Sequence, residues 1–539
     1  MTSASPRAAD ILAQRLYEAG CRHAFGMPGG EVLTLVDALE KAGIAFHLAK
    51  HENAAGFMAE GVHHVDGAPA ILVATVGPGA MNGVNVVANA LQDRVPLMVL
   101  TGCVDADEAL SYTHQVLDHA AVFAPLTKGS FRLTPGGADT IADKAVSLAM
   151  APRQGPVHID VPISVADAPS VPSVTRRLTP ASAMAPTGAD LAKAREWLAA
   201  AKKPVAILGL DVLADGSACV VQAFLEHFQI SFVTTYKAKG VVDEGHALCL
   251  GGAGLSPLAD RHLVPFIQSA DLILCIGYDP IEMRTGWREI WDPETQNVID
   301  IAAVANDHYM HQAGLNIIGH TGASLEAMAQ GLRGSETWAG GEIAAVKAAL
   351  AEAFPTDEPW GPAAVIEETR KVMPVGTLAT ADSGAHRILL SQMWACEAPK
   401  ALVQSSGLCT MGCAVPLAIG LKLAAPDRPV VSFSGDAGFL MVAGELATAR
   451  ELGLPVIFVV FVDASLALIE LKQRQRQMAN RGVDFDRHDF AAMGRAFGGH
   501  GATVRSRNEL RAALEAAMEA DSFTVIAAEI DRGAYDGRI

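Results

Sequence analysis

The chain reads VVSFSGDAGFL at residues 430–440 and GLPVIFVVFVD at residues 453–463. Each stretch contains an apolar run typical of a buried strand, and a glycine turn that can open a helix follows the first run. Asp436 lies in this turn, and Asp463 ends the second run 27 residues later. The pattern predicts a strand, a turn, a helix and a second strand, with both carboxylates at the same edge of a parallel sheet.

The residues of this unit are suited to a metal ion and a phosphate group. Mg2+ prefers oxygen ligands and is usually held by one or two carboxylates together with substrate phosphates. Asp436 and Asp463 could supply the carboxylates, and the carbonyl of Ser465 a further ligand. Gly435 and Gly438 would let the backbone approach a diphosphate at the helix N-terminus. The alternative is an ordinary strand-turn-helix in which Asp436 only caps the helix.

The rest of the chain repeats the alternation of apolar runs and helical segments in three blocks. The runs include APAILVATV and PVHIDVP in the first block, KKPVAILGL and ADLILCIGYD in the second, and FTVIAAEI in the third. This alternation predicts an α/β protein with three domains, each a doubly wound parallel sheet. We expect the domains at residues 1–165, 189–335 and 360–539, with a Pro-, Ser- and Ala-rich linker at 165–188.

Composition narrows the classes of partner and compartment. Of the 539 residues, 59 are acidic and 41 basic, and the net charge of −18 argues against nucleic acid or an anionic membrane as a partner. The strongest apolar run, residues 454–462, is too short to span a bilayer. The eight cysteines form no CxxC pair, so we expect free thiols in a reducing cytoplasm rather than disulfides or zinc ligands.

Several motifs resemble those of thiamine diphosphate (ThDP) enzymes. Residues 435–469 resemble the diphosphate-binding motif of that family, and GLCTMGCAVPLAIG at 407–420 and DSGAHR at 382–387 resemble two further cofactor loops. In the first block, matches to the pyrimidine-binding domain of the acetolactate synthase and pyruvate oxidase group are FGMPGGEVLTLVDAL, KHENAAGFMAEG, TVGPGAMNGVNVVANA and PLTKG. The resemblance covers all three blocks in order and implies three ThDP-enzyme domains: pyrimidine-binding, middle and diphosphate-binding.

The resemblance implies ThDP and Mg2+ as cofactors and a set of residues that bind them. Glu52 matches the glutamate that hydrogen-bonds the aminopyrimidine ring of ThDP, and Met411 the bulky apolar residue under the folded cofactor. A surface or helix-capping role for Glu52 and a core role for Met411 are the alternatives. The other implied cofactor contacts are Ala385, His386, Cys409, Gly435, Asp436, Ala437, Gly438, Asp463, Ala467 and Leu468, and the implied metal ligands are Asp436, Asp463 and Ser465.

The implied substrate contacts are less tightly matched. His114 and Gln115 fall where related enzymes place polar groups facing the reacting carbon, and Gln115 is the better match. For His114 and for Lys128, structural and functional roles are equally open. The loop Pro28-Gly29-Gly30 would face the site through its backbone. Lys472 stands where biosynthetic relatives have tryptophan; it belongs either to a solvated basic helix face or to a basic entrance for an anionic 2-oxo acid.

One metal ligand departs from the family pattern. Asp463 stands where the family usually has asparagine, and Val462 replaces the asparagine before it. An aspartate still offers an oxygen to the metal, but it adds negative charge beside an anionic diphosphate. We therefore predict that the metal site persists and binds its cation more tightly.

The resemblance also bears on FAD and on assembly. CIGYDPIEMRTGW at 275–287 is closer to flavin-independent relatives, and the glycine cluster GGAGLS at 251–256 is weak support for a phosphate loop, so we expect no FAD. In this family Glu52 and the Asp436 motif of one active site come from different chains, which implies a homodimer or homotetramer.

Three functions fit these expectations. The first is decarboxylation of a 2-oxo acid such as pyruvate followed by carboligation, as in acetolactate synthase. The second is decarboxylation, or another C–C cleavage, with release of an aldehyde. The third is a ThDP-binding homologue without turnover, against which the intact Glu52 argues.

Overall fold

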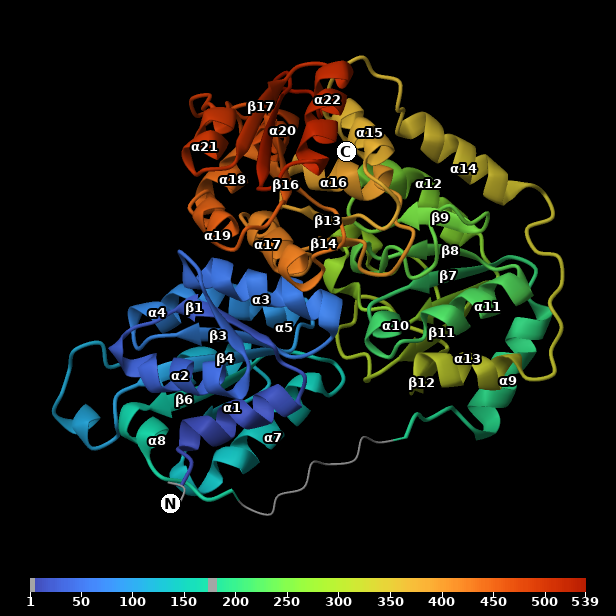
Figure 1. Ribbon diagram of the computed structural model, residues 1–539. Helices are drawn as coiled ribbons and strands as arrows, with labels where there is room; N and C mark the ends of the chain where they lie inside the picture. Colours follow the sequence, from blue (N-terminus) through green and yellow to red (C-terminus); the bar gives the residue numbers. More distant parts are fainter. Residues whose placement is uncertain (1–4, 173–181) are drawn as a thin grey trace.

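The computed structural model describes residues 5–172 and 182–539 and contains three α/β units, each built on a six-stranded parallel sheet (Figure 1). The predicted fold class is thereby confirmed. Part of the predicted linker, residues 173–181, lies outside the described residues. The start of that linker overlaps the end of helix α8 (Ile163–Asp167), and helix α9 begins at Gly188.

The first unit has the strand order β2-β1-β3-β4-β6-β5. Its strands are β1 His23–Met27, β2 Ala45–Leu48, β3 Ala70–Ala74, β4 Leu97–Cys103, β5 Ser130–Arg132 and β6 Val157–Pro162. Helices α1 Ala8–Glu18, α2 Leu33–Ala42, α7 Ala138–Met150 and α8 pack together on one face, and α3 Glu52–Asp66, α4 Pro78–Asn82, α5 Val84–Gln92 and α6 His119–Phe123 lie on the other. The loop between β4 and α6 extends away from the body of this unit (Figure 1).

The second unit has the order β12-β11-β10-β7-β8-β9. Its strands are β7 Pro204–Leu208, β8 Ser231–Thr234, β9 Cys249–Gly252, β10 Leu272–Ile276, β11 Asn297–Ala302 and β12 Leu315–Ile318. Helices α9 Gly188–Ala200, α10 Asp211–Ala214, α11 Ala218–Phe228 and α13 Thr321–Ala329 cover one face, and α12 Pro257–Gln268 and α14 Glu342–Ala353 the other.

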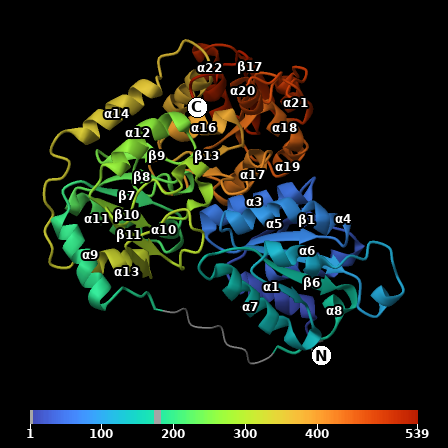
Figure 2. The same ribbon diagram turned by 180° about the vertical axis from the view of Figure 1, so that it is seen from behind.

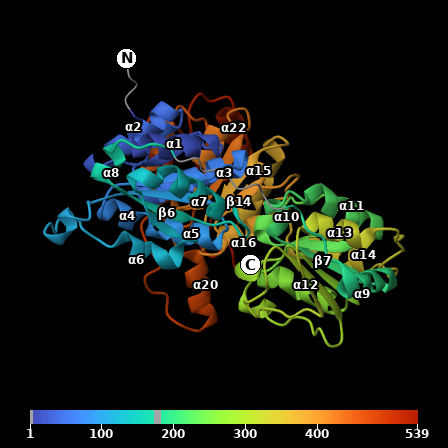
Figure 3. The same cartoon turned by 90° about the horizontal axis from the view of Figure 1, so that it is seen from below.

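The third unit has the order β14-β13-β15-β16-β18-β17. Its strands are β13 Leu378–Ala381, β14 Leu402–Gln404, β15 Val430–Gly435, β16 Ile457–Val462, β17 His500–Val504 and β18 Thr524–Glu529. Helices α15 Pro362–Val372, α16 Ala385–Met393 and α22 Arg507–Met518 lie on one face, and α17 Ala414–Ala424, α18 Asp436–Val442, α19 Glu445–Glu451 and α21 Phe490–Ala496 on the other. Helix α20 (Ala467–Gln475) extends outward, as the view from below shows (Figure 3).

The first and third units share one hydrophobic core, because helix α3 packs directly on α17 (Figure 2). Glycines make this close crossing possible. A Cβ atom on Gly61 would lie 2.4 Å from the carbonyl oxygen of Leu417, and one on Gly420 would lie 2.0 Å from that of Met58. The two helix backbones therefore touch at these glycines, and a larger residue at either position would push them apart.

Two expectations from composition can be compared with the structure. Across residues 5–172 and 182–539, every helix is too short or too polar to cross a bilayer. All eight cysteines are free thiols, and six of them are buried. The prediction of free thiols is thus confirmed.

Candidate active site

Asp436 and Asp463 meet at the carboxyl edge of the third sheet. Strands β15 and β16 are parallel neighbours, so the residues that follow them lie side by side. The Oδ2 atom of Asp436 accepts hydrogen bonds from the backbone N–H of Asp463 at 3.1 Å and of Ala464 at 2.8 Å. Its Oδ1 atom accepts one from Ala437 at 2.8 Å. The predicted strand-turn-helix-strand unit is present, and the hydrogen bonds that Asp436 accepts join the carboxyl ends of its two strands.

The two carboxyl groups carry more negative charge than their surroundings compensate. Burial raises the pKa of Asp436, although four backbone N–H groups oppose the shift. Burial and then the charge of Asp436 raise the pKa of Asp463 to about 7. Tyr535 is buried beside the pair, and burial together with the charges of Asp463 and Asp436 raises its pKa well above the usual value. A cation bound between the carboxylates would remove this repulsion.

A cavity of about 560 Å³ opens in front of this pair. It is lined by the predicted cofactor residues of the third unit: Ala385, His386, Cys409, Met411, Gly435, Asp436, Ala437, Gly438, Asp463, Ala467 and Leu468, with Ser465 beside them. Among these predicted residues, the two farthest apart in the chain, Ala385 and Leu468, are separated by 83 positions. Three further lining residues, Leu255, Pro257 and Arg284, come from the second unit, and their part in this cavity had no signal in the sequence.

The cavity has unsatisfied polar groups that suit an anionic ligand. The Oγ atom of Ser383 and the Nε2 atom of His386 are buried without a hydrogen-bond partner among the described residues, and both side chains line the cavity. Burial, and then the nearby Arg387, lower the pKa of His386 to about 3, so its ring is neutral and can donate one hydrogen bond. The ring stacks on Phe461 with 5.4 Å between centroids, which fixes its direction.

Asp382 positions the loop that carries Met411, a role that sequence reasoning missed. Its buried carboxyl group accepts hydrogen bonds from the backbone N–H of Gly412 at 3.0 Å and of Cys413 at 3.2 Å. Burial raises its pKa to about 6. A Cβ atom on Gly438 would lie 2.1 Å from its Oδ2 atom, so glycine is required for the first turn of α18 to approach. The polar residue directly after strand β13 was the available signal.

The donor set of this cavity fits ThDP and a divalent cation. Two carboxylates suit a hard cation, and Ser383, His386 and the N-terminus of α18 suit the diphosphate. Lys472 also lines the cavity although its side chain is exposed, which places it at the mouth. This position favours the interpretation of Lys472 as part of a basic entrance.

Glu52 lies in a second group of residues, in the first unit. It begins helix α3, is 3% exposed, and its Oε2 atom accepts a hydrogen bond from the Asn82 side chain at 2.9 Å. Its Oε1 atom is so close to Gly79 that a Cβ there would lie 3.1 Å away. Among the described residues that line the Asp436 cavity, Glu52 is absent.

The turn Thr75–Gly79 gathers the other predicted residues of the first unit. A Cβ atom on Gly77 would lie 3.0 Å from the Cβ of Gln115, and one on Gly29 would lie 2.2 Å from the Oγ1 of Thr75. Gln115 itself has a φ of 58°, in the left-handed region. The structure therefore places Gln115 and the Pro28-Gly29-Gly30 loop around the same turn that contacts Glu52.

The two remaining candidates of the first unit, His114 and Lys128, do not belong to this group. His114 is exposed, and its ring meets the ring of Tyr112 edge-on at 6.2 Å between centroids. The Nζ atom of Lys128 donates a hydrogen bond to the carbonyl of Ala151 at 2.7 Å, and burial lowers its pKa. Of the two open interpretations of Lys128, the contact favours the structural one.

Comparisons with known proteins agree with this geometry. Models of the thiamine pyrophosphate enzyme family match the N-terminal TPP binding domain at residues 6–122, the central domain at 191–328 and the C-terminal TPP binding domain at 382–528. The chain is 30% identical to acetolactate synthase of Bacillus subtilis, over 97% of this chain and 93% of that protein. It is 28% identical to the catabolic acetolactate synthase of Raoultella terrigena, over 97% and 95%.

A third relative, the large subunit of Escherichia coli acetolactate synthase isozyme 1, is 29% identical over 86% of this chain and 83% of its own length. These similarities extend over all three units and include both groups of site residues. The chain therefore belongs to the thiamine pyrophosphate enzyme family, as a ThDP-dependent decarboxylase or carboligase similar to the acetolactate synthases.

Proposed function

We propose that the chain decarboxylates a 2-oxo acid such as pyruvate and joins the remaining two-carbon unit to a second carbonyl compound, with ThDP and Mg2+ as cofactors. The cavity before Asp436 and Asp463 carries this proposal, because its lining combines two carboxylates, unpaired polar atoms and apolar side chains. The three relatives described above are all named acetolactate synthases, which supports the carboligation step.

The metal would lie between Asp436 and Asp463, with the carbonyl of Ser465 as a third protein ligand. Its charge would offset both the carboxylate pair and the diphosphate. Ser383 and His386 would donate to the diphosphate through their unpaired polar atoms. Met411, on the loop that Asp382 holds, would support the cofactor from below.

Bound ThDP supplies a carbon nucleophile for the 2-oxo acid and an electron sink for loss of carbon dioxide. Glu52 would share a proton with the aminopyrimidine ring and so favour the form of the ring that acts as a base. Gln115 and His114 would face the reacting carbon. Lys472, at the mouth of the cavity, would attract the carboxylate of the substrate.

The complete site requires a second copy of the chain. Glu52 is in the first unit and does not line the Asp436 cavity of its own chain, yet both groups are needed for the reaction. Large apolar side chains are exposed near each group: Met27, Leu48 and Leu117 in the first unit, and Met441 and Ile469 in the third. A homodimer, alone or paired into a homotetramer, would cover them and join the two halves of the site.

A substrate panel tests the proposal. Purified protein with added ThDP and Mg2+ is incubated with single 2-oxo acids and with pairs of them, and the products are identified by mass. Carboligation predicts a 2-hydroxy-2-substituted 3-oxo acid as the product, also from a single 2-oxo acid when that compound serves as both donor and acceptor. The alternative, an aldehyde-releasing decarboxylase, predicts an aldehyde as the product, with carbon dioxide release that no acceptor increases. Absence of flavin absorbance in the active protein would agree with our expectation of no FAD. We also propose a cytoplasmic location, which the free thiols fit.

A further inference from the structure

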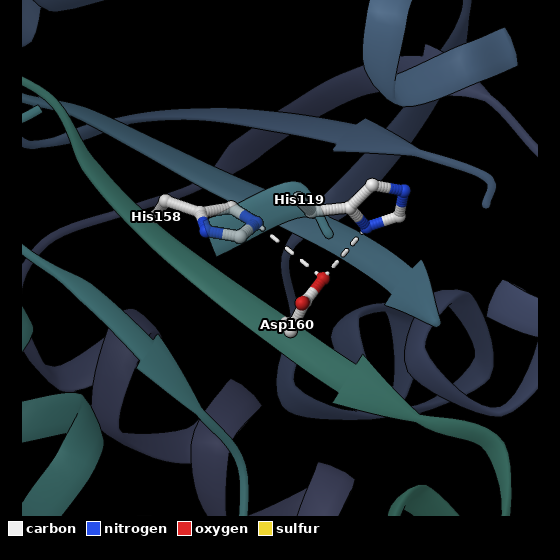
Figure 4. A group of neighbouring side chains, drawn as sticks. All are labelled: His119, His158 and Asp160. Carbon is white, nitrogen blue, oxygen red and sulfur yellow. Dashed lines mark hydrogen bonds and ion pairs between the residues drawn. The ribbon is translucent and has the colours of Figure 1, made fainter. Parts of the chain in front are cut away.

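His119, His158 and Asp160 form a buried cluster in the first unit, away from the Asp436 cavity (Figure 4). The Nδ1 atom of His119 is 2.9 Å from Oδ1 of Asp160, and the Nε2 atom of His158 is 3.5 Å from the same oxygen. Two imidazoles and a carboxylate could hold a metal ion or could form a chain of hydrogen bonds. The neighbouring hydroxyl groups decide between these possibilities.

Thr101 and Ser130 occupy the remaining positions around His158. The hydroxyl of Thr101 is 2.7 Å from Nε2 of His158 and 2.6 Å from Oδ1 of Asp160, and Ser130 Oγ is 2.7 Å from Nδ1 of His158. Although burial opposes it, the hydrogen bond from His119, the proximity of His158 and the hydroxyl of Thr101 keep the pKa of Asp160 below its usual range, so this group is an acceptor only.

Because the carboxylate of Asp160 only accepts hydrogen bonds, the positions of the protons in the cluster follow. Thr101 has a single hydroxyl proton and gives it to Asp160, so it accepts the Nε2 proton of His158, whose Nδ1 accepts from Ser130. Both nitrogens of His158 are then engaged, and neither offers a lone pair to a metal. The cluster is a directed chain of hydrogen bonds.

The chain ends on a backbone amide. The N–H of Gly77 donates to Nε2 of His119 at 3.2 Å, which requires the imidazole to be neutral with its proton on Nδ1, toward Asp160. Gly77 has a φ of 65° and lies in the turn between β3 and α4. Asp160 therefore fixes the tautomer that lets His119 hold this turn.

The turn held by His119 contacts two predicted catalytic residues. A Cβ atom on Gly77 would lie 3.0 Å from Gln115, and one on Gly79 would lie 3.1 Å from Oε1 of Glu52. His119 also follows Gln115 by four residues and begins helix α6, so it anchors the end of the exposed loop that carries Gln115. The buried side chain of His119 thus restrains both the turn that contacts Glu52 and the loop that carries Gln115.

We infer that His119, oriented by Asp160, is a positioning residue for the reaction: it holds the Gly77 turn and thereby sets the relative places of Glu52 and Gln115. The inference rests on the proposed function, in which these two residues act on cofactor and substrate. Displacing a catalytic group by about 1 Å can lower turnover on the order of 100-fold.

Three variants test this role in the full-length protein with ThDP and Mg2+. His119→Leu removes both polar contacts and keeps the volume, His119→Gln keeps an acceptor for Gly77, and His158→Leu is the matched control, because His158 is equally buried but does not touch the turn. Both leucine variants should lower the melting temperature. Only His119→Leu should lower kcat, on the order of 10- to 100-fold with little change in KM, and His119→Gln should recover most of the loss.

Hydrogen exchange provides a readout that does not depend on turnover. In His119→Leu, peptides covering residues 75–82 and 104–118 should exchange faster than in the wild type, whereas His158→Leu should leave them protected. This result would support the positioning role even if no 2-oxo acid were turned over, so failure of the proposed function would remain distinguishable. Equal loss of kcat in both leucine variants with unchanged exchange at the turn would overturn the inference. So would one bound metal ion per wild-type chain, measured by elemental analysis, that both leucine variants lose.

Discussion

At the scale of single residues, the carboxyl groups of Asp436 and Asp463 lie at the centre of the proposed cofactor site, and both line the cavity of the third unit. Asp436, Met411 and His386 could be located because a local motif fixes each one relative to a strand end, and the structure places all three at one cavity. Tyr535 and Arg284 could not be found, because their contributions depend on tertiary contacts with no local pattern, whereas Asp382 had a local signal in its place directly after strand β13. The raised pKa of Asp463 could not be predicted either, because it depends on the burial of the side chain.

The raised pKa of Asp463 predicts a pH effect on stability. Its pKa is about 7 in the folded protein and near 4 when unfolded, so the folded state holds an extra proton between these values. The stability associated with this proton is present at low pH and is lost as pH rises through 7. In metal-free protein, Asp463→Asn should therefore raise the free energy of unfolding by roughly 2–4 kcal/mol at pH 8 and change little at pH 4.

Melting temperatures in the presence of a chelator measure this difference. The same variant should bind Mg2+ about 10-fold more weakly in the presence of ThDP, because it loses an anionic ligand. Identical melting curves of the two proteins at pH 8 would show that the charge of Asp463 does not destabilise the metal-free fold.

The proposed role of Glu52 predicts a loss of turnover without a loss of fold. Glu52→Gln keeps the hydrogen bond with Asn82 but cannot share a proton with the cofactor, so kcat should fall about 10²- to 10⁴-fold. Glu60→Gln is the control, since Glu60 lies on the same helix, is 1% exposed, and burial raises its pKa. Turnover of both variants on pyruvate is the measurement, and an active Glu52→Gln protein would refute the mechanism.

At the scale of helices and strands, alternation of apolar runs was sufficient to predict the parallel sheets. The runs around 430–435 and 457–462 became neighbouring strands β15 and β16 as the spacing indicated. The packing of α3 on α17 was not predictable, because the contacts between the first and third units join residues more than 300 positions apart, such as Asn89 and Ser405 with a separation of 316. The domain boundaries at 165, 189, 335 and 360 remain predictions.

The close crossing of α3 and α17 predicts the effect of a single methyl group. Gly420→Ala would gain about 1 kcal/mol from helix propensity, but its Cβ would meet the Met58 carbonyl at 2.0 Å, and overpacking costs about 1–3 kcal/mol or more. We expect a net decrease of the melting temperature by a few degrees. Gly136→Ala, where the added atom meets nothing within 4 Å, should leave it unchanged. A stabilised Gly420→Ala protein would show that the two backbones separate at low cost.

At the scale of the whole molecule, the proposed function divides the active site between two groups of residues, so that one chain contains two incomplete halves. Glu52 and its turn lie in the first unit, and the residues proposed to hold the metal and the diphosphate lie in the third, at a cavity that Glu52 does not line. The family resemblance in the sequence implied such a division, but no pattern in a single chain could show it, because symmetry between copies leaves no mark on local sequence.

Subunit complementation tests the central claim, that Glu52 of one chain acts with Asp436 of another. Glu52→Gln and Asp436→Asn proteins, each nearly inactive alone, are dissociated, mixed in equal amounts and reassociated with ThDP and Mg2+. A mixed dimer has one site with both residues intact, and half of all dimers are mixed, so turnover should return to about one quarter of the wild-type value. If mixing restores no activity although mass spectrometry detects mixed dimers, Glu52 and Asp436 of the same chain act together, which contradicts an active site shared between two chains.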